Sequence, residues 1–145
     1  MSSAPQTYAN HAKLVPMYHF VGFGLLVVNF GWTGWQLFRA FSAANAVAFL
    51  LAIGLFFVFF YARVFALGVQ DRVIRLEERM RMERLFDGDL KARIKDFTTE
   101  QLIGLRFAPD DELAALARRV LDERIADRKT IKQAVRNWRV DHQRI

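Results

Sequence analysis

The N-terminal half of this 145-residue chain has no acidic side chain. All 15 Asp and Glu residues lie within 71–145, and the residues before position 71 carry only Lys13, Arg39 and Arg63 as full charges. A soluble domain carries charged groups over its whole surface, so this segregation excludes one ordinary globular core. We therefore expect the front of the chain to meet lipid and the remainder to meet water.

Cysteine is also missing, which excludes a disulfide scaffold, thiol catalysis and cysteine-based zinc or iron–sulfur sites. The sequence contains no glycine-rich phosphate-binding loop, no nucleophile-elbow motif and no Ser–His–Asp pattern typical of a catalytic triad. The histidines, His11, His19 and His142, have no close metal-ligand partner along the chain. We therefore predict that the protein is not an enzyme, and we predict no metal and no cofactor.

Two apolar runs, 17–38 and 43–62, contain no full charge. As helices rising about 1.5 Å per residue, each can cross a hydrocarbon core of about 30 Å. The predicted fold is all-α: a two-helix transmembrane hairpin whose second helix extends into the cytoplasm, followed by a small helical bundle. A cleaved signal peptide or a hairpin buried in a soluble protein are the alternatives. The length of the first run and the scarcity of polar residues in 1–70 argue against both.

The predicted organisation has three parts: an N-terminal cytoplasmic segment at 1–16, the transmembrane hairpin at 17–67 and a cytoplasmic helical domain at 68–145. Several arginines follow the second run, whereas the turn between the runs holds Arg39 alone. The positive-inside rule then places both termini in the cytoplasm. We predict a multi-pass protein of the bacterial cytoplasmic (inner) membrane.

Small residues repeat at intervals of four or seven on the two runs, at Gly24, Gly31, Ala44, Ala48 and Ala52. Such residues let helices approach closely in lipid, where no hydrophobic effect drives them together. Asn29 and Gln36 share one face of the first run, and Asn29 lies near mid-membrane, where it needs a hydrogen-bond partner. These residues are interpreted as packing within the hairpin or as a contact with another membrane subunit.

The second run continues without a strong helix breaker, which predicts one helix over about 44–86. Its later part carries an apolar stripe with spacings of four, three and four, formed by Val69, Val73, Leu76 and Met80. The stripe covers two heptads, fewer than a coiled coil needs, so we expect it to seat the C-terminal domain or to form a short dimer contact. Ion pairs at a four-residue separation are expected beside it, namely Asp71–Arg75, Glu77–Arg81 and Arg79–Glu83.

The C-terminal part predicts three or four short helices and no strand. Thr98 or Thr99 can cap one of them, and Pro109 followed by three acidic residues marks the start of another. Asp127 can cap the last helix, which we expect to carry Ile131, Val135 and Trp138 on one face. Because so short a segment is marginal as an independent core, we expect it to pack on the long helix or on a partner.

Two ligand hypotheses follow from isolated features. The isoelectric point of about 10.2 suggests nucleic acid, but acids alternate with bases through the C-terminal part and no established DNA-binding signature occurs. We therefore predict no nucleic-acid partner. His19 begins the first run, and a lone membrane histidine is a weak candidate ligand for haem or a chlorophyll-type pigment, although an interfacial histidine is the commoner case.

Several short segments resemble one known family: Tyr8-Ala9-Asn10-His11, Pro16 with Tyr18-His19, the long segment from Val69 to Arg79, Leu105-Arg106-Phe107 and Asn137-Trp138-Arg139. The chain is similar to a family of uncharacterised small bacterial membrane proteins, a domain of unknown function. The resemblance covers nearly the whole chain, and the long segment is its most specific part. It implies a two-span bacterial membrane protein, and it supplies no activity, cofactor or active residue.

Together these features predict an integral membrane accessory or scaffold protein, a subunit of a homo- or hetero-oligomeric complex. A membrane-anchored signalling or regulatory module and a haem- or pigment-binding subunit are the alternatives. The expected partners are the lipid bilayer and other membrane subunits or the protein itself. Gln70, Asp71, Arg72 and Arg75, just beyond the second run, are expected to dock the C-terminal helices or another subunit.

Overall fold

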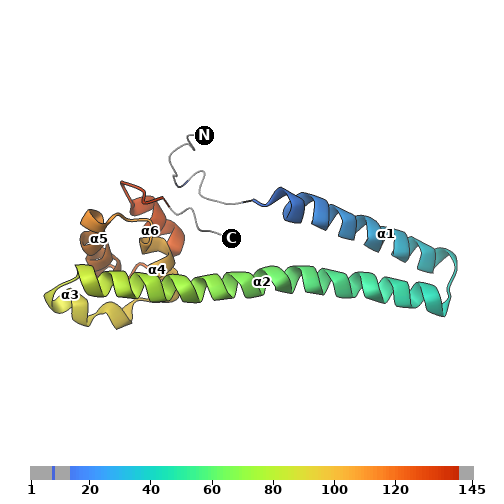
Figure 1. The fold of residues 1–145 in the computed structure, drawn as a ribbon, viewed down its shortest axis with the longest axis horizontal. Coiled ribbons are helices and arrows are strands. Elements are labelled where there is room, and N and C mark those ends of the chain that lie inside the picture. Colours follow the sequence, from blue (N-terminus) through green and yellow to red (C-terminus); the bar gives the residue numbers. More distant parts are fainter. Residues whose placement is uncertain (1–7, 9–13, 141–145) are drawn as a thin grey trace. The chain divides into compact units, whose positions relative to one another are not determined.

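The computed structural model describes Tyr8 and residues 14–140, and all its regular elements are helical. In chain order they are η1 (Met17–Gly22, π-helical), α1 (Phe23–Arg39), α2 (Ala43–Leu85), α3 (Gly88–Ala92), η2 (Ile94–Asp96, a 3₁₀ turn), α4 (Thr99–Leu105), α5 (Asp110–Asp122) and α6 (Arg128–Ala134) (Figure 1). No strand occurs among the described residues, so the predicted all-α class is confirmed for them. The described residues divide into two compact units, one formed by 14–67 and a second that contains 68–140.

In the first unit, η1 and α1 run antiparallel to the early part of α2 (Figure 1). Aromatic rings form the contact. The ring of Tyr18 stacks on that of Phe59 with centroids 4.1 Å apart, and Phe30 lies 5.0 Å from Phe49. The turn between the helices is closed by Asn45, whose side-chain amide donates to the carbonyl oxygen of Ala40 at 2.7 Å. Aromatic interdigitation therefore holds this pair of helices.

One described helix, α2, is both long enough and apolar enough to cross a membrane. It spans 43 residues, close to the predicted 44–86. The first predicted span coincides with η1 and α1, but α1 itself has only 17 residues. The prediction of a second membrane-crossing helix is thus not confirmed by length and composition.

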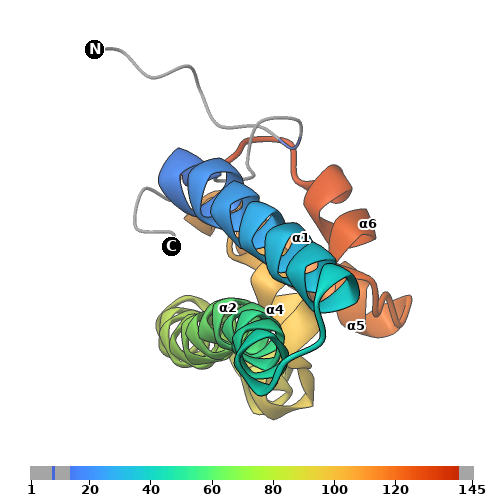
Figure 2. The same ribbon diagram turned by 90° about the vertical axis from the view of Figure 1, so that its right-hand side faces the viewer.

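The second unit has a core to which every one of its helices contributes. Its buried apolar side chains are Met82, Phe86, Leu90, Ile94, Phe97, Leu102, Leu105, Phe107, Ala108, Leu113, Leu116, Ala117, Val120, Ile131 and Val135. The helix α6 packs against α4 (Figure 1); Figure 2 gives the view along α2. Because Met82 belongs to α2, the long helix is itself part of this core, as predicted from the small size of the domain.

Local sequence accounts for where these helices begin. Thr98, rather than Thr99, caps α4: its side chain accepts from the backbone N–H of Gln101, whose own side chain accepts from the backbone of Thr98. Asp127 caps α6 by accepting from the backbone N–H of Thr130 at 2.8 Å. Pro109 precedes α5 in extended conformation and serves as its N-cap. Side chains that accept from the free N–H groups of a first turn define the starts of α4 and α6, whereas the N-cap of α5 makes no such side-chain hydrogen bond.

The expectation that α6 continues to Trp138 is wrong. The helix ends at Ala134, and Val135 is already extended. Trp138 instead lies on Phe107, with ring centroids 4.6 Å apart. The side chain reaches the core from an irregular segment, so its helical spacing from Ile131 was coincidental.

The face of α2 that meets the domain is also not the predicted one. Val69, Val73, Leu76 and Met80 are 61%, 47%, 62% and 63% exposed. The buried residues are instead Ile74, Glu78, Arg81 and Met82, which lie on the opposite side of the helix at 100° per residue. The prediction that the apolar stripe seats the domain is therefore wrong, because α2 meets the domain through a mixed face on which a buried ion pair replaces part of the apolar contact.

Candidate functional site

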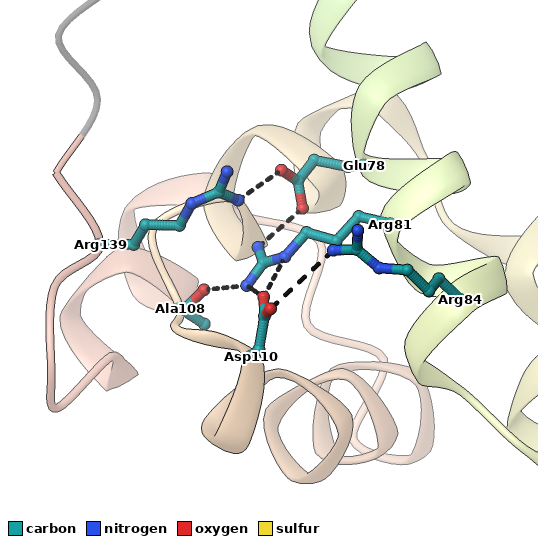
Figure 3. Close-up of polar contacts among 6 residues, drawn as sticks. All are labelled: Glu78, Arg81, Arg84, Ala108, Asp110 and Arg139. Carbon is teal, nitrogen blue, oxygen red and sulfur yellow. Dashed lines mark hydrogen bonds and ion pairs between the residues drawn. The ribbon is translucent and has the colours of Figure 1, made fainter.

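A polar cluster surrounds the buried side chain of Arg81 on α2 (Figure 3). The guanidinium donates from Nε to Oδ1 of Asp110 at 2.7 Å and from Nη2 to the carbonyl oxygen of Ala108 at 2.8 Å. Its Nη1 lies 3.2 Å from Oε2 of Glu78. The forked geometry of arginine lets one side chain satisfy three acceptors at once. Arg81 therefore joins α2 to the start of α5 and to the residues before it.

Glu78 is the acidic centre of this cluster and is only 5% exposed. Its Oε1 lies 3.6 Å from Nη1 of Arg139, so two guanidinium groups flank the carboxylate. Burial raises the pKa of the Glu78 carboxyl, and the charge and hydrogen bond of Arg81 oppose that rise. The pKa of the Asp110 carboxyl is lowered, mainly because the carboxylate accepts a hydrogen bond from Arg81. The buried carboxylate of Glu78 therefore depends on its cationic partners, because their loss would leave a buried charge without compensation.

The C-terminal segment after α6 is fastened beside this cluster. The carboxylate of Glu112 accepts from the backbone N–H groups of Arg136 at 3.0 Å and Asn137 at 3.2 Å. The backbone N–H of Arg139 donates to the carbonyl oxygen of Phe107 at 2.8 Å. Two of the family-like segments, 105–107 and 137–139, thus meet in space. Sequence reasoning assigned Glu112 to the helix terminus and missed this second role.

The small residues of the first unit are placed unequally. Ala52 is buried, Ala48 is half-buried and Ala44 is exposed. A Cβ added at Gly24 or Gly31 would meet no atom within 4 Å, so these two glycines do not lie at the contact. Close approach occurs elsewhere, at Gly22 and Gly34, where an added Cβ would lie 3.4 Å and 3.2 Å from the rings of Phe59 and Phe49. At these two positions glycine makes room for a phenylalanine ring of α2, and it does not pack against small residues of that helix.

The two polar residues predicted at this contact behave differently. The side chain of Asn29 is exposed and has no hydrogen-bond partner among the residues that the structure describes, while its carbonyl oxygen accepts from Thr33 Oγ1 at 2.8 Å. Gln36 is half-buried, and its carbonyl oxygen accepts from the side chain of Asn45 at 3.4 Å. The expected partner of Asn29 is thus not within the described part of this chain.

Beyond the apolar part of α2, the predicted docking residues differ in their exposure. Arg72 and Arg75 are exposed and, with Leu76 and Arg79, line an open surface hollow. The side-chain oxygen of Gln70 is buried and accepts no hydrogen bond from any residue that the structure describes. Asp71 is half-buried. The ion pairs predicted along this stretch do not form, and Arg81 pairs with Glu78 in place of Glu77.

His19 lies in η1 with Nδ1 3.0 Å from the carbonyl oxygen and 3.1 Å from the amide nitrogen of Val15. Its ring meets the edge of Tyr18 at 5.2 Å. One ring nitrogen is therefore engaged locally, and a role as a haem or pigment ligand stays a prediction that an absorption spectrum of the purified protein would test. Within the described ranges, no group of three or more His, Cys, Asp or Glu residues could hold a metal ion. His11 and His142 lie outside the described residues.

The fold and the cluster define the class: an all-α chain in which one long apolar helix also carries part of a small helical domain. Within that class, the chain belongs to a family of unknown function, DUF6526, whose model matches residues 1–145. This agrees with the resemblance found in the sequence at the level of an uncharacterised family. No curated protein and no solved structure matches the chain.

Proposed function

We propose that the protein is an integral membrane accessory or scaffold subunit that presents its helical domain on the cytoplasmic side of a bacterial inner membrane. The observation that carries this is the exposure of large apolar side chains along η1, α1 and the early part of α2, among them Leu25, Val28, Phe38, Phe57, Val58 and Phe65. Each large apolar side chain left in water forgoes roughly 1.5–3 kcal/mol of burial. Lipid removes this cost for the whole surface at once.

Two crossings are proposed rather than one, because Met17–Arg39 is long enough to span lipid when η1 and α1 are taken together. The hydroxyl of Tyr18 donates to the carbonyl oxygen of Phe59, which ties the start of η1 to α2 far along the chain. At the other end, the guanidinium of Arg39 lies 5.4 Å from the ring of Trp35. An aromatic ring and an arginine at the end of an apolar helix suit the interface between lipid and water.

Cytoplasmic termini are proposed from the distribution of arginine. Arg63, Arg72, Arg75 and Arg79 follow the apolar part of α2, whereas the turn between α1 and α2 has Arg39 alone. The side with more basic residues near the spans stays in the cytoplasm. The domain, which follows these arginines, is then cytoplasmic as well.

A scaffold role is favoured by the way in which the charged and polar side chains are distributed between the interior and the surface. Two of the domain's buried charges, Glu78 and Arg81, are paired with each other, which fixes helices in place rather than leaving a reactive group open. The exposed arginines Arg72 and Arg75 and the exposed amide of Asn29 remain available to other subunits.

A regulatory role is the second proposal, and one observation favours it. The helix α2 carries both the apolar stretch and residues of the domain core, such as Met82. A change at the membrane could then reach the domain through a single element. Altered cross-linking between α2 and its neighbours when an effector is added would support this role over a passive scaffold.

The membrane proposal is tested by fractionation and labelling. Cells expressing the protein are lysed without detergent, and membranes are washed at alkaline pH; the protein should stay in the membrane pellet. Because the chain has no cysteine, Ser42→Cys and Lys91→Cys each create one labelling site. A membrane-impermeant maleimide applied to cells with a permeabilised outer membrane should label only the first. Release into the wash, or labelling of Lys91→Cys alone, would overturn the proposed placement.

A further inference from the structure

The exposed apolar stripe of α2, formed by Val69, Val73, Leu76 and Met80, has no partner among the described residues. It lies on the opposite side of the helix from Ile74 and Met82, which the domain covers. Large apolar side chains in register on one helix face are typical of an interface rather than of a solvated surface. The domain thus leaves free the face whose periodicity suits a second helix.

We propose that this stripe binds the same stripe of a second copy of the chain, in a short parallel two-stranded coiled coil. The inference rests on the proposed membrane placement, because two copies inserted with one topology have their α2 helices pointing the same way. Confinement to a membrane also raises the effective concentration of the two helices, so a short contact suffices where it would fail between freely diffusing chains.

The two central side chains of the stripe, Val73 and Leu76, fit a two-stranded coiled coil. With Val73 at heptad position a, Leu76 occupies d and Met80 the next a, while Val69 occupies the preceding d. A β-branched residue at a followed by leucine at d favours parallel dimers over higher oligomers. Glu83, which falls at the next d position, ends the apolar pattern.

The charges beside the stripe fit the same parallel register. Arg72 then lies at position g and Glu77 at position e, and in a parallel pair each g residue faces the e residue of the following heptad in the other chain. Both side chains are exposed, and neither forms an ion pair with the described residues of its own chain. Two Arg72–Glu77 pairs therefore form across the dimer. The next such pair, Arg79 with Arg84, is repulsive, which limits the contact to these two heptads.

Single cysteines in the otherwise cysteine-free chain test the arrangement in native membranes. Val69→Cys, Val73→Cys, Leu76→Cys and Met80→Cys are each oxidised with a copper catalyst, and disulfide-linked dimers are counted on a non-reducing gel. The dimer fraction should be several-fold higher at these positions than for Arg75→Cys, an exposed control on α2 outside the stripe. Bonds between identical positions at both ends, 69 and 80, require parallel helices. An antiparallel pair would link only positions near its crossing point.

A charge exchange gives a second measurement. Arg72→Glu should lower the dimer fraction of Leu76→Cys several-fold, and Arg72→Glu with Glu77→Arg should restore it. Stripe cysteines that link no better than Arg75→Cys in washed membranes would overturn the dimer and leave the membrane placement intact. Protein found in the soluble fraction would overturn the membrane placement, while same-position links there would still support the dimer. Cysteines that neither link nor react with a water-soluble maleimide would place the stripe in lipid and overturn the dimer.

Discussion

Gly104 of α4 lies against Ile131 of α6 with no room for a methyl group: a Cβ added to the glycine would come within 2.8 Å of the Cβ and Cγ2 atoms of the isoleucine. Ile131 is fully buried, so it has little space to retreat. Gly104→Ala should therefore destabilise the domain by roughly 1–3 kcal/mol, the usual cost of overpacking a core. Urea unfolding of the purified protein, followed by circular dichroism, measures the change.

Gly68→Ala is the matched control for that substitution. Gly68 also lies within a helix, but a Cβ added there would have no heavy atom within 4 Å. The variant should be neutral or more stable by up to about 1 kcal/mol, since alanine favours helix. Equal losses in the two variants would show that α4 and α6 are not in close contact.

Arg81→Met should unfold the domain. The substitution leaves Glu78 buried without its nearest cation, and stranding one member of a buried ion pair costs roughly 3–5 kcal/mol. The double variant Glu78→Leu with Arg81→Met removes both charges and should recover most of the loss. Protease resistance of the domain in membranes compares the three proteins. A double variant as unstable as Arg81→Met alone would argue that the hydrogen bonds to Asp110 and Ala108 dominate.

Stability should depend on pH through Glu78. Its pKa is raised by burial from the ordinary value of 4.5, so its contribution to stability is full below that value and is lost as pH rises through the folded-state pKa. Glu78→Gln has no such loss. Its free energy of unfolding, relative to the unsubstituted protein, should therefore increase from about pH 4 to about pH 7.

The same urea titrations, repeated over this pH range, isolate the Glu78 effect. Asp110 has a lowered pKa because it accepts a hydrogen bond from Arg81, so its contribution is present above the unfolded pKa and is lost as pH falls. That contribution is common to both proteins and largely cancels in their difference. A constant difference across the range would show that burial does not raise the Glu78 pKa.

Thr98→Ala should cost about 1 kcal/mol, because it removes the side chain that accepts from the backbone N–H of Gln101 at the start of α4. Thr99→Ala, one residue later and inside the helix, keeps the capping box and should change stability far less. Thermal unfolding of the two variants under identical conditions compares them. A larger loss for Thr99→Ala would mean that α4 begins one residue later than described.

Features that depend on a few neighbouring residues could be predicted from the sequence. The length of α2, the cap at Asp127 and the start of α5 after Pro109 follow from apolar runs and capping chemistry that act within one helical turn. The absence of strands among the described residues follows in the same way. For the caps near Thr98, the sequence offered two adjacent threonines, and the glutamine three residues after the first selects between them.

Features that depend on distant partners could not be predicted. The stripe around Leu76 is more apolar than the face around Glu78, so hydrophobicity alone selected the wrong side of α2. The buried face becomes favourable only because Asp110 and the carbonyl oxygen of Ala108, far along the chain, meet Arg81. Likewise, an acidic residue at position 112 is already expected at the start of a helix, so the sequence gives no separate indication that Glu112 accepts from the backbone N–H of Arg136.

The sharing of α2 between an apolar stretch and a domain core decides where the protein can be cut. A soluble fragment that starts at Gly88, after the last turn of α2, would lack Ile74, Met82 and Phe86, all of which are buried. Its hydrophobic interior would be open on one side, and it should aggregate. An expression boundary for the isolated domain therefore belongs inside a helix, near Gly68, rather than in the loop where a designer would ordinarily place it.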